Sequence, residues 1–266
     1  MRLPHPGLTW QSSPPAKGGV ASLALALLLG GLQAPGAAGP LPAHTLPSPA
    51  TGLRLNPYQL RRATGVPPAP GSMAEAEDLA ILRWLQRFRS PQVVASTWLL
   101  LDRDLNAFSS AVGAELTPLN PVLASGLQGF MAPVNDAYRT FKKEHRRVRP
   151  YLAHPGLHPC LPPEDTGSFP SGHAIWFRTT ASLLSDLLPE RQVRLEHVGR
   201  QGGGNRVLCG VHYPSDVDAG QRLGAEAARQ IIASPQWRAF RNHPALQEEL
   251  KRLRAIPEEA LPPLVR

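Results

Sequence analysis

The chain has 266 residues, of which 42% are hydrophobic and 18% charged, and its net charge is +8. This apolar content excludes a disordered chain, and the presence of only two cysteines excludes a disulfide-dense mini-protein. A mean hydropathy of −0.20 excludes a protein with several membrane spans. The basic charge favours an anionic partner, which is nucleic acid, a membrane surface or an anionic substrate.

The N-terminal segment predicts an export signal. Arg2 and Lys17 precede an apolar run at residues 18–31, and small residues follow at 36–38. The run is too short to span a bilayer comfortably. We therefore expect residues 1–38 to be a cleaved signal peptide, with an uncleaved anchor as the alternative. Export would place the mature chain in the periplasm or outside the cell, in an oxidising compartment.

The rest of the sequence predicts helices. Residues 39–70 are rich in proline and are expected to form an extended, poorly ordered arm. Ser72 followed by Glu75 is a capping box, after which apolar residues recur at helical spacing. With no alternating strand pattern and no repeat, the expected class is all-α, a single helical bundle over residues 71–266. The expected helices cover residues 72–88, 91–112, 121–149 with a new start or kink at Pro133, 171–187, 190–201, 214–233, and two short helices from 235 and 244.

Three clusters of residues carry candidate chemistry, and the first is a pair of cations. Lys142 and Arg149 are seven residues apart, which is two helical turns, so both are expected on one helix face. Two cations on one face can bind a phosphate or a carboxylate, since Arg offers a planar fork and Lys a point charge. The alternative is a solvated helix face, because basic pairs at this spacing are common.

The second cluster is Pro170-Ser171-Gly172-His173, between a loop and an expected helix. The unpaired N–H groups at a helix N-terminus suit an anion, and Gly172 lets a ligand approach the backbone closely. His173 would then lie beside the anion with an ordinary pKa near neutral, which suits a general acid or base. The alternative is an ordinary helix cap followed by a structural histidine.

The third cluster contains Asn205, Arg206, His212 and Asp216. Three glycines at 202–204 are expected to end the preceding helix and let the chain turn sharply before Arg206. Asp216 would lie in the first turn of the next helix and hold one imidazole nitrogen of His212, leaving the other as a nucleophile. The alternative is that Asp216 is a plain helix cap.

The three clusters in this order resemble the three-part motif of the type-2 phosphatidic acid phosphatase superfamily. That superfamily includes the vanadium-dependent haloperoxidases and the bacterial class A non-specific acid phosphatases. Residues 167–174 and 206–219 are most similar to the secreted acid phosphatases, and the resemblance covers about residues 66–255. One position differs, because family members usually have Ser where this chain has Asn205. The Asn amide can also donate a hydrogen bond, although it is longer than Ser.

The resemblance implies a helical bundle of the acid phosphatase and vanadium-dependent haloperoxidase type. It implies a secreted acid phosphatase that hydrolyses phosphate monoesters through a phosphohistidine. In that mechanism His212 attacks phosphorus, His173 is the general acid and Asp216 orients His212. A bell-shaped pH profile on the acid side of neutral is expected, with His173 protonated and His212 neutral. The phosphate-binding residues implied are Lys142, Arg149, Ser171, Gly172, Asn205 and Arg206.

Cys160 and Cys209 flank the second and third clusters, and we predict a disulfide between them; the alternative is two small buried hydrophobic residues. No metal or cofactor is expected, because three cations supply the charge. His154 and His158 lie in a Pro- and Gly-rich loop and are not expected to bind zinc.

The expected partners are small-molecule phosphate monoesters, without nucleic acid as a specific ligand and without a membrane span after signal removal. A homodimer is an expectation by analogy alone. The alternative functions are a haloperoxidase that holds vanadate in the same site and a basic, secreted protein that binds an anion without catalysis. A membrane lipid phosphatase would need several apolar spans after residue 38, and the sequence has none.

Overall fold

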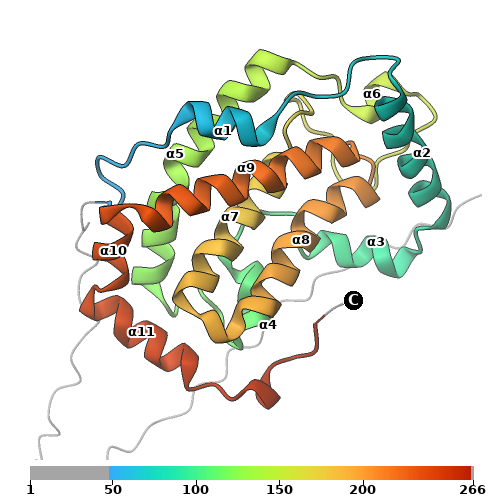
Figure 1. Ribbon diagram of the computed structural model, residues 1–266. Coiled ribbons are helices and arrows are strands. Elements are labelled where there is room, and N and C mark those ends of the chain that lie inside the picture. The colour runs from blue at the N-terminus through green and yellow to red at the C-terminus, as the bar shows by residue number, and fades with distance from the viewer. Residues whose placement is uncertain (1–47, 265–266) are drawn as a thin grey trace, which may run out of the picture. The chain divides into compact units, whose positions relative to one another are not determined.

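The computed structural model describes residues 48–264, which form helices and connecting loops (Figure 1). No strand occurs within this range, so the predicted all-α class is confirmed. The helices are α1 (Pro57–Thr64), α2 (Met73–Phe88), α3 (Pro91–Trp98), η1 (Leu105–Phe108), α4 (Ser109–Val112), α5 (Pro121–His145), α6 (Pro150–Ala153), α7 (Gly172–Leu187), η2 (Pro189–Arg191), α8 (Gln192–Leu208), α9 (Pro214–Ala233), α10 (Pro235–Arg241), α11 (Pro244–Arg254) and η3 (Glu258–Ala260).

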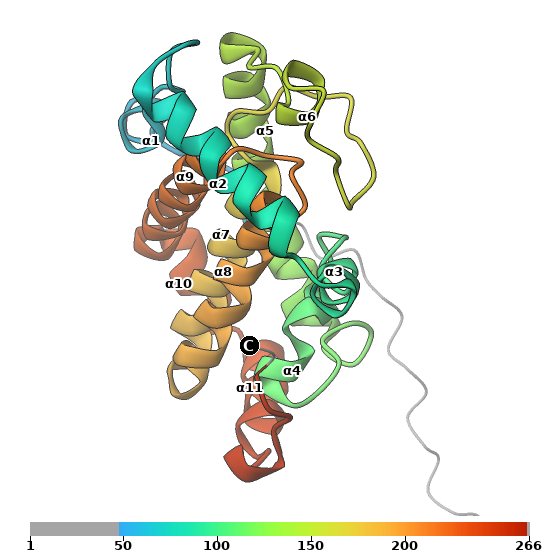
Figure 2. The same ribbon diagram turned by 90° about the vertical axis from the view of Figure 1, so that its right-hand side faces the viewer.

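Helix α7 is the centre of the bundle, with α8 and α9 packed along it and α5 against another side (Figures 1 and 2). Its apolar residues, among them Ile175, Phe177 and Leu184, are fully buried. A helix that is apolar on most of its circumference must be covered by neighbours, which explains its central place. The N-terminus of α7 carries the second sequence cluster, so the central helix of the core positions one part of the candidate site.

Glycines let α8 and α9 approach α7 closely. A Cβ atom added to Gly202 of α8 would lie 2.1 Å from Cγ of Phe177, and one added to Gly220 of α9 would lie 2.7 Å from the Ser171 carbonyl oxygen. The prediction that α8 ends at the glycines 202–204 is therefore wrong, because the helix continues to Leu208. Gly202 and Gly203 serve helix packing, whereas Gly204 has open space around it, and the turn lies after Leu208.

The helix expected over residues 91–112 is broken, which corrects a second prediction. α3 ends at Trp98, and the side chain of Asp104 caps η1 by accepting from the Asn106 N–H at 3.0 Å. The break leaves the carbonyl groups of Leu100 and Leu101 outside a helix. Both of them accept hydrogen bonds from Arg206.

The helix expected over residues 121–149 ends early. α5 runs through Pro133 without a new start and ends at His145, where Arg146 adopts a left-handed conformation with φ 48°. Arg149 is the N-cap of the short helix α6, which begins at Pro150. Lys142 and Arg149 therefore do not share a helix face.

The expected extended arm is also corrected. Residues 57–64 form α1, which the Asn56 side chain caps and which packs beside α9, with Leu60 buried (Figure 1). Arg222 of α9 donates from Nε to the Ala63 carbonyl oxygen at 2.9 Å. Asn56 followed by Pro57 is a helix start of the same kind as Ser90 followed by Pro91. The proline-rich composition of the segment concealed this helix start.

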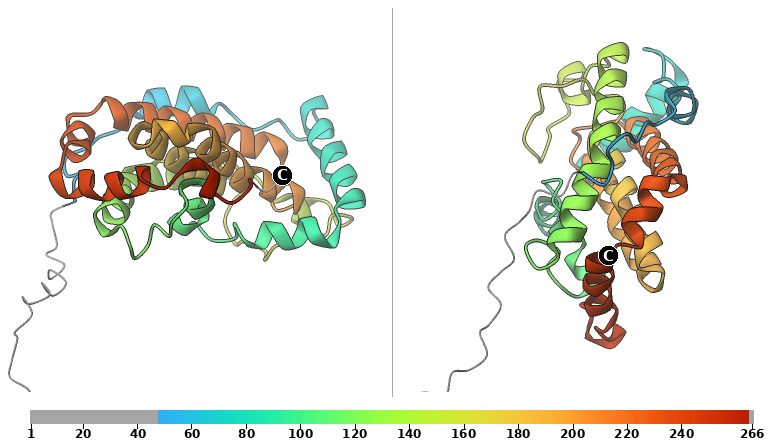
Figure 3. Two further views of the ribbon diagram at one scale, coloured as in Figure 1. Left: turned by 90° about the horizontal axis from the view of Figure 1, so that it is seen from below. Right: turned by 90° about the vertical axis from the view of Figure 1, so that its left-hand side faces the viewer.

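The two short C-terminal helices are confirmed as α10 and α11, and they lie at the opposite end of the bundle from α2 and α3 (Figures 1 and 3). The predicted signal peptide at residues 1–38 lies outside the described residues. Within residues 48–264, no helix combines the length and apolar character needed to cross a membrane.

Candidate active site

The three sequence clusters meet at one end of α7. The Ser171 N–H donates to the Asp216 carbonyl oxygen at 3.0 Å, which joins the start of α7 to the start of α9. Arg149 belongs to residues 146–170, here called the loop segment, and its Nη1 donates to the Val211 carbonyl oxygen at 2.9 Å, which joins this segment to the third cluster. Residues of all three clusters therefore lie together at this end of α7.

His212 and Asp216 are completely buried and face each other. Asp216 Oδ2 lies 3.4 Å from His212 Nδ1 and accepts from the Tyr213 N–H at 2.9 Å. On the other side of the ring, Arg149 Nη1 lies 2.9 Å from His212 Nε2. A guanidinium group can only donate, so Nε2 accepts and the ring proton resides on Nδ1, facing Asp216. The unprotonated Nε2 is the nitrogen with nucleophilic character.

Arg147 is a site residue that the sequence analysis missed. Its Nη1 donates to Asp216 Oδ1 at 2.7 Å, its Nη2 donates to Asp78 Oδ2 of α2 at 3.0 Å, and its guanidinium lies 3.8 Å from the Tyr213 ring centroid. The residue lies in the basic run 142–149, but its spacing matches none of the three clusters. Its inward direction follows from the turn after α5, which sequence periodicity does not reveal.

The charge of Asp216 is set by opposing effects. Burial works to raise the pKa of Asp216, whereas the hydrogen bond and charge of His212, the charge of Arg147 and the Ser168 hydroxyl lower it. The net direction is a lowered pKa, so Asp216 is an anion. An anion at this place holds the Nδ1 proton of His212 and stabilises the ring when it becomes cationic.

Lys142 and Arg149 converge through the loop segment, although they are on different helices. Lys142 Nζ lies 3.4 Å from Thr166 Oγ1 and also donates to the Gly167 carbonyl oxygen, while Arg149 Nη2 lies 3.2 Å from the same Thr166 Oγ1. Burial lowers the pKa of Lys142 to about 8, and the charge of Arg149 adds to this effect. Lys142 is therefore a cation at acid and neutral pH.

Arg206 and His173 share one backbone acceptor. Arg206 Nη2 donates to the Leu101 carbonyl oxygen at 2.6 Å, and His173 Nε2 lies 3.0 Å from the same oxygen. Since a carbonyl only accepts, Nε2 of His173 carries the proton and Nδ1 is the free acceptor. Nδ1 points towards Glu164, whose Oε1 is 3.8 Å away. Lys142, Arg149 and Arg206 together form what we call the cationic cluster.

Both His212 and His173 have lowered pKa values. Burial lowers the pKa of His212 to about 4, with a further contribution from the charge of Arg149. Burial also lowers the pKa of His173 to about 3, and the charge of Arg206 acts in the same direction. The neutral His212 agrees with the expected state of a nucleophile, whereas the neutral His173 differs from the expected protonated acid. The reasons are the burial of the His173 ring and the positive charge of Arg206 beside it.

The other predicted site residues, Ser171, Gly172 and Asn205, differ in their positions and contacts. Ser171 is buried and caps α7 by accepting from the Ala174 N–H at 3.4 Å, so its capping role is observed. Gly172 lies at the first turn of α7 and borders the cavity described next. Asn205 is in the last turn of α8, and its side chain makes no hydrogen bond to another residue within 48–264. Within the described range, no hydrogen bond therefore links the Asn205 side chain to the other site residues.

Two cavities of about 1120 and 1100 Å³ border the site and share several lining residues, including His173 and Glu164. Lys142 and Gly172 line the first cavity, and Arg206 and Trp176 line the second. His212 lines neither of them. Glu164 is a second residue that the sequence analysis missed, because a single Glu in a proline-rich loop has no distinguishing pattern.

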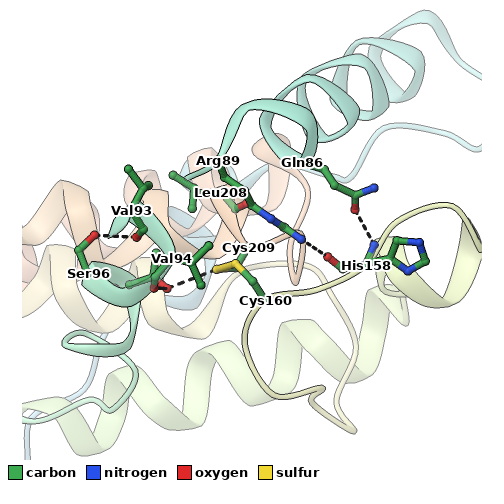
Figure 4. Close-up of a disulfide and its surroundings, with 10 residues drawn as sticks. Gln86, Arg89, Val93, Val94, Ser96, His158, Cys160, Leu208 and Cys209 are labelled. Carbon is green, nitrogen blue, oxygen red and sulfur yellow. Dashed lines mark hydrogen bonds between the residues drawn. A yellow bond between two sulfur atoms is a disulfide. The ribbon is translucent and has the colours of Figure 1, made fainter. Parts of the chain in front are cut away.

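The predicted disulfide is confirmed (Figure 4). Cys160 of the loop segment is bonded to Cys209, which follows the last residue of α8, and the Cys160 N–H donates to the Cys209 carbonyl oxygen at 3.0 Å. Arg89 supports this connection by donating to the carbonyl oxygens of His158 and Leu208. The bond ties the loop segment to the helix that carries Arg206.

No three His, Cys, Asp or Glu side chains within the described range are arranged as metal ligands. His154 and His158 lie in the loop after α6, where they were expected.

Comparison with known proteins identifies the family. The non-specific acid phosphatase of Providencia stuartii is 30% identical over 182 residues, which cover 64% of this chain and 73% of that protein. The chain belongs to the non-specific acid phosphatase family. The non-specific acid phosphatase of Salmonella typhimurium is 34% identical over 138 residues, or 49% of this chain, and the match spans about half (54%) of that relative.

Two further comparisons complete the description of this non-specific acid phosphatase family member. The acid phosphatase of Zymomonas mobilis is 27% identical over 205 residues, covering 71% of this chain and 74% of that protein. The crystal structure of a transmembrane PAP2 type phosphatidylglycerolphosphate phosphatase from Bacillus subtilis gives a TM-score of 0.47 at 22% identity, covering 65% of this chain and 92% of that one. No family model matches the chain.

Proposed function

We propose that the protein is an acid phosphatase that hydrolyses phosphate monoesters of small molecules through a phosphohistidine at His212. The observation that carries this proposal is the state of the His212 ring. Its Nδ1 proton faces the buried Asp216, and its unprotonated Nε2 lies against Arg149 of the cationic cluster. A nucleophilic nitrogen beside a phosphate-binding cation is the arrangement that phosphoryl transfer to histidine requires.

Substrate binding is assigned to the cationic cluster. Lys142, Arg149 and Arg206 neutralise the phosphoryl oxygens, and the Gly172 N–H at the start of α7 adds a donor with the positive end of the helix dipole. Charge that develops on those oxygens in the transition state is stabilised by the same groups. We propose that these side chains supply the positive charge without a metal ion.

In the first chemical step, the Nε2 lone pair of His212 attacks phosphorus and the bond between phosphorus and the ester oxygen breaks. The ring, now phosphorylated on Nε2 and protonated on Nδ1, is cationic, and Asp216 stabilises it. Arg147 keeps Asp216 anionic and in place through its contact at 2.7 Å. Arg147 thus acts through Asp216 as a positioning residue.

His173 is assigned the proton transfer. A bound phosphate dianion would offset the nearby cations and raise the pKa of His173 from about 3, so that it can protonate the leaving oxygen. In the second step His173 accepts a proton from water, the water oxygen bonds to phosphorus and the bond between phosphorus and Nε2 breaks. Phosphate and the starting protonation state result.

We infer that the protein works outside the cytoplasm, in the periplasm or after secretion. The disulfide between Cys160 and Cys209 suits an oxidising compartment. The apolar run at residues 18–31 supports export through a signal peptide at residues 1–38. The catalytic domain of this proposal extends over residues 71–266.

Hydrolysis of p-nitrophenyl phosphate from acid to neutral pH, with EDTA present, tests the proposal. We expect activity in the wild type, and a loss of about 10³-fold or more in His212→Ala, because the nucleophile is absent. His158→Ala, a matched control at an exposed histidine of the loop segment, should retain full activity. Acid-quenched reactions with ³²P-labelled substrate should contain labelled wild-type protein and unlabelled His212→Ala. A folded wild type without turnover that oxidises bromide after vanadate loading would overturn the proposal.

The role of His173 has a separate test. His173→Ala should lose much more activity on an alkyl phosphate than on p-nitrophenyl phosphate, because only the poor leaving group needs a proton in the transition state. Equal losses on the two substrates would show that His173 is not the general acid.

A further inference from the structure

Glu164 places a carboxylate directly on the cationic cluster. Its Oε2 accepts from Arg149 Nη2 at 2.6 Å, a short charge-assisted hydrogen bond. Arg149 is almost completely buried, whereas the Glu164 side chain is 30% exposed and borders both cavities. The carboxylate therefore lies between the cavities and the buried cation.

The position of this carboxylate relative to the reacting groups is specific. The same guanidinium that binds Glu164 through Nη2 binds His212 Nε2 through Nη1, at 2.9 Å. The other carboxylate oxygen, Oε1, is 3.8 Å from Nδ1 of His173. Glu164 is thus located between Arg149, which lies beside the nucleophile, and the general acid His173. A phosphoryl oxygen must bind at this place in the proposed reaction.

Glu164 is an anion in this place. Burial works to raise the pKa of Glu164, but the charges of His212, Arg149 and His173 outweigh it and lower the pKa to about 2. Arg149 Nη2 is also bonded to Thr166 Oγ1 at 3.2 Å, so its donors are fully used before a ligand arrives. A phosphate that binds Arg149 from the cavities must therefore take over the contact of Glu164.

We propose that Glu164 occupies the phosphoryl subsite on Arg149 in the free enzyme and is displaced by substrate. This inference rests on the proposed function of the same site. The carboxylate keeps the cations paired when the site is empty, and it returns to Arg149 when phosphate leaves. Its presence weakens the binding of phosphate and of substrate alike and favours the release of the product.

Glu164→Gln tests the proposal, because it keeps the size of the side chain and removes its charge. Calorimetric titration with inorganic phosphate at pH 6–7 should show about tenfold tighter binding than in the wild type. The reason is that phosphate no longer has to displace a charge-assisted hydrogen bond from Arg149. KM for p-nitrophenyl phosphate should fall by a similar factor, and inhibition by product phosphate should increase. Glu164→Ala should change phosphate affinity in the same direction.

Asp165→Asn is the matched control. It removes the same charge from the neighbouring position in the loop segment, which also borders the first cavity but whose side chain is exposed and forms no ion pair within the described residues. Its phosphate affinity should stay within about twofold of the wild type, since a solvated charge contributes little. Equal tightening in Asp165→Asn and Glu164→Gln would overturn the proposal, because the effect would then be one of net charge.

The remaining outcomes separate the two proposals. Phosphate affinity that is unchanged or weaker in a folded Glu164→Gln variant would overturn the displacement of Glu164. A lower kcat with unchanged phosphate affinity would do the same, and would assign Glu164 to the positioning of His173. If Glu164→Gln binds phosphate more tightly but the wild type hydrolyses no phosphate ester, the displacement stands and the proposed function fails.

Discussion

The two sides of the site are held in different ways. Arg206, His212 and Asp216 belong to α8, α9 and the turn between them, and close helix packing around α7 determines their places. Arg147, Arg149 and Glu164 belong to the loop segment 146–170, whose conformation depends on side-chain hydrogen bonds and one disulfide. The first side is rigid because its backbone is packed in the core, whereas the second is held by polar contacts.

This difference matches what each side does in the proposed reaction. A nucleophile and its orienting carboxylate must keep their geometry through every step, which close-packed helices ensure. Groups that bind phosphate must exchange partners in each turnover. The contact between Arg149 and Glu164 is a hydrogen bond that a phosphate oxygen can replace, so the loop segment suits that exchange.

The largest effect is expected at the helical side. Asp216→Asn keeps the shape of the side chain but removes the charge that holds the Nδ1 proton of His212. We expect kcat to fall by about 10³-fold or more. The measurement is p-nitrophenyl phosphate hydrolysis together with a thermal melt that checks folding. A folded variant with nearly full activity would contradict the assigned role of Asp216.

The next effect concerns Arg147, where the loop segment meets the helical side. Arg147→Met leaves the buried Asp78 and Asp216 without their shared cation, which should lower the free energy of unfolding by about 3–5 kcal/mol. Chemical denaturation measures this change. Arg83→Met, at an exposed arginine of α2, is the control and should change stability by less than about 0.5 kcal/mol. Similar losses of unfolding free energy in Arg147→Met and Arg83→Met would show that the ion pairs of Arg147 do not stabilise the protein.

Removal of the disulfide should loosen the loop segment alone. The double variant Cys160→Ser with Cys209→Ser releases a link between residues 49 positions apart and should lose about 2–4 kcal/mol of stability. Phosphate affinity should weaken as well, because Arg149 and Thr166 lie in the released segment. Denaturation curves and phosphate titration measure the two effects. Two free thiols in native wild-type protein, found by non-reducing mass spectrometry, would contradict the bond itself.

A glycine pair tests whether close packing sets the helical side. In Gly202→Ala the new methyl group meets the Phe177 ring, and we expect a loss of about 1–3 kcal/mol. Gly204, two residues further along α8, has open space around it, so Gly204→Ala should gain about 0.5–1 kcal/mol from helix propensity. Thermal and chemical denaturation compare the two variants. A gain in both would mean that α8 has room to move away from α7.

The smallest expected effect is a titration shift at His173. The pKa of about 3 in the free protein keeps its imidazole neutral above that pH, and bound phosphate should raise the pKa by about one unit or more. Phosphate-bound protein therefore keeps His173 protonated to higher pH. NMR titration of the His173 Cε1–H signal, with and without phosphate, measures the shift, and exposed His158 serves as the reference. Identical curves would contradict an anion beside His173.

Sequence patterns located most helices but misplaced several ends. Ser72 and Ser171 were correct caps because a cap depends on neighbouring residues. The glycines 202–204 predict a helix end, but Gly202 accommodates the Phe177 ring, which is distant in sequence. Lys142 and Arg149 converge on Thr166 and do not share the one helix face that their spacing predicts.

The sequence by itself determined the all-α class, the order of the three clusters and the choice of the side chains proposed to react, because these depend on residue types and short spacings. Tertiary structure alone decided that Arg147 neutralises Asp216 and that Glu164 lies on Arg149. These facts depend on how the chain turns after His145 and on the approach of α8 to α7. Such contacts join residues far apart in sequence, and they form only when the whole core is packed.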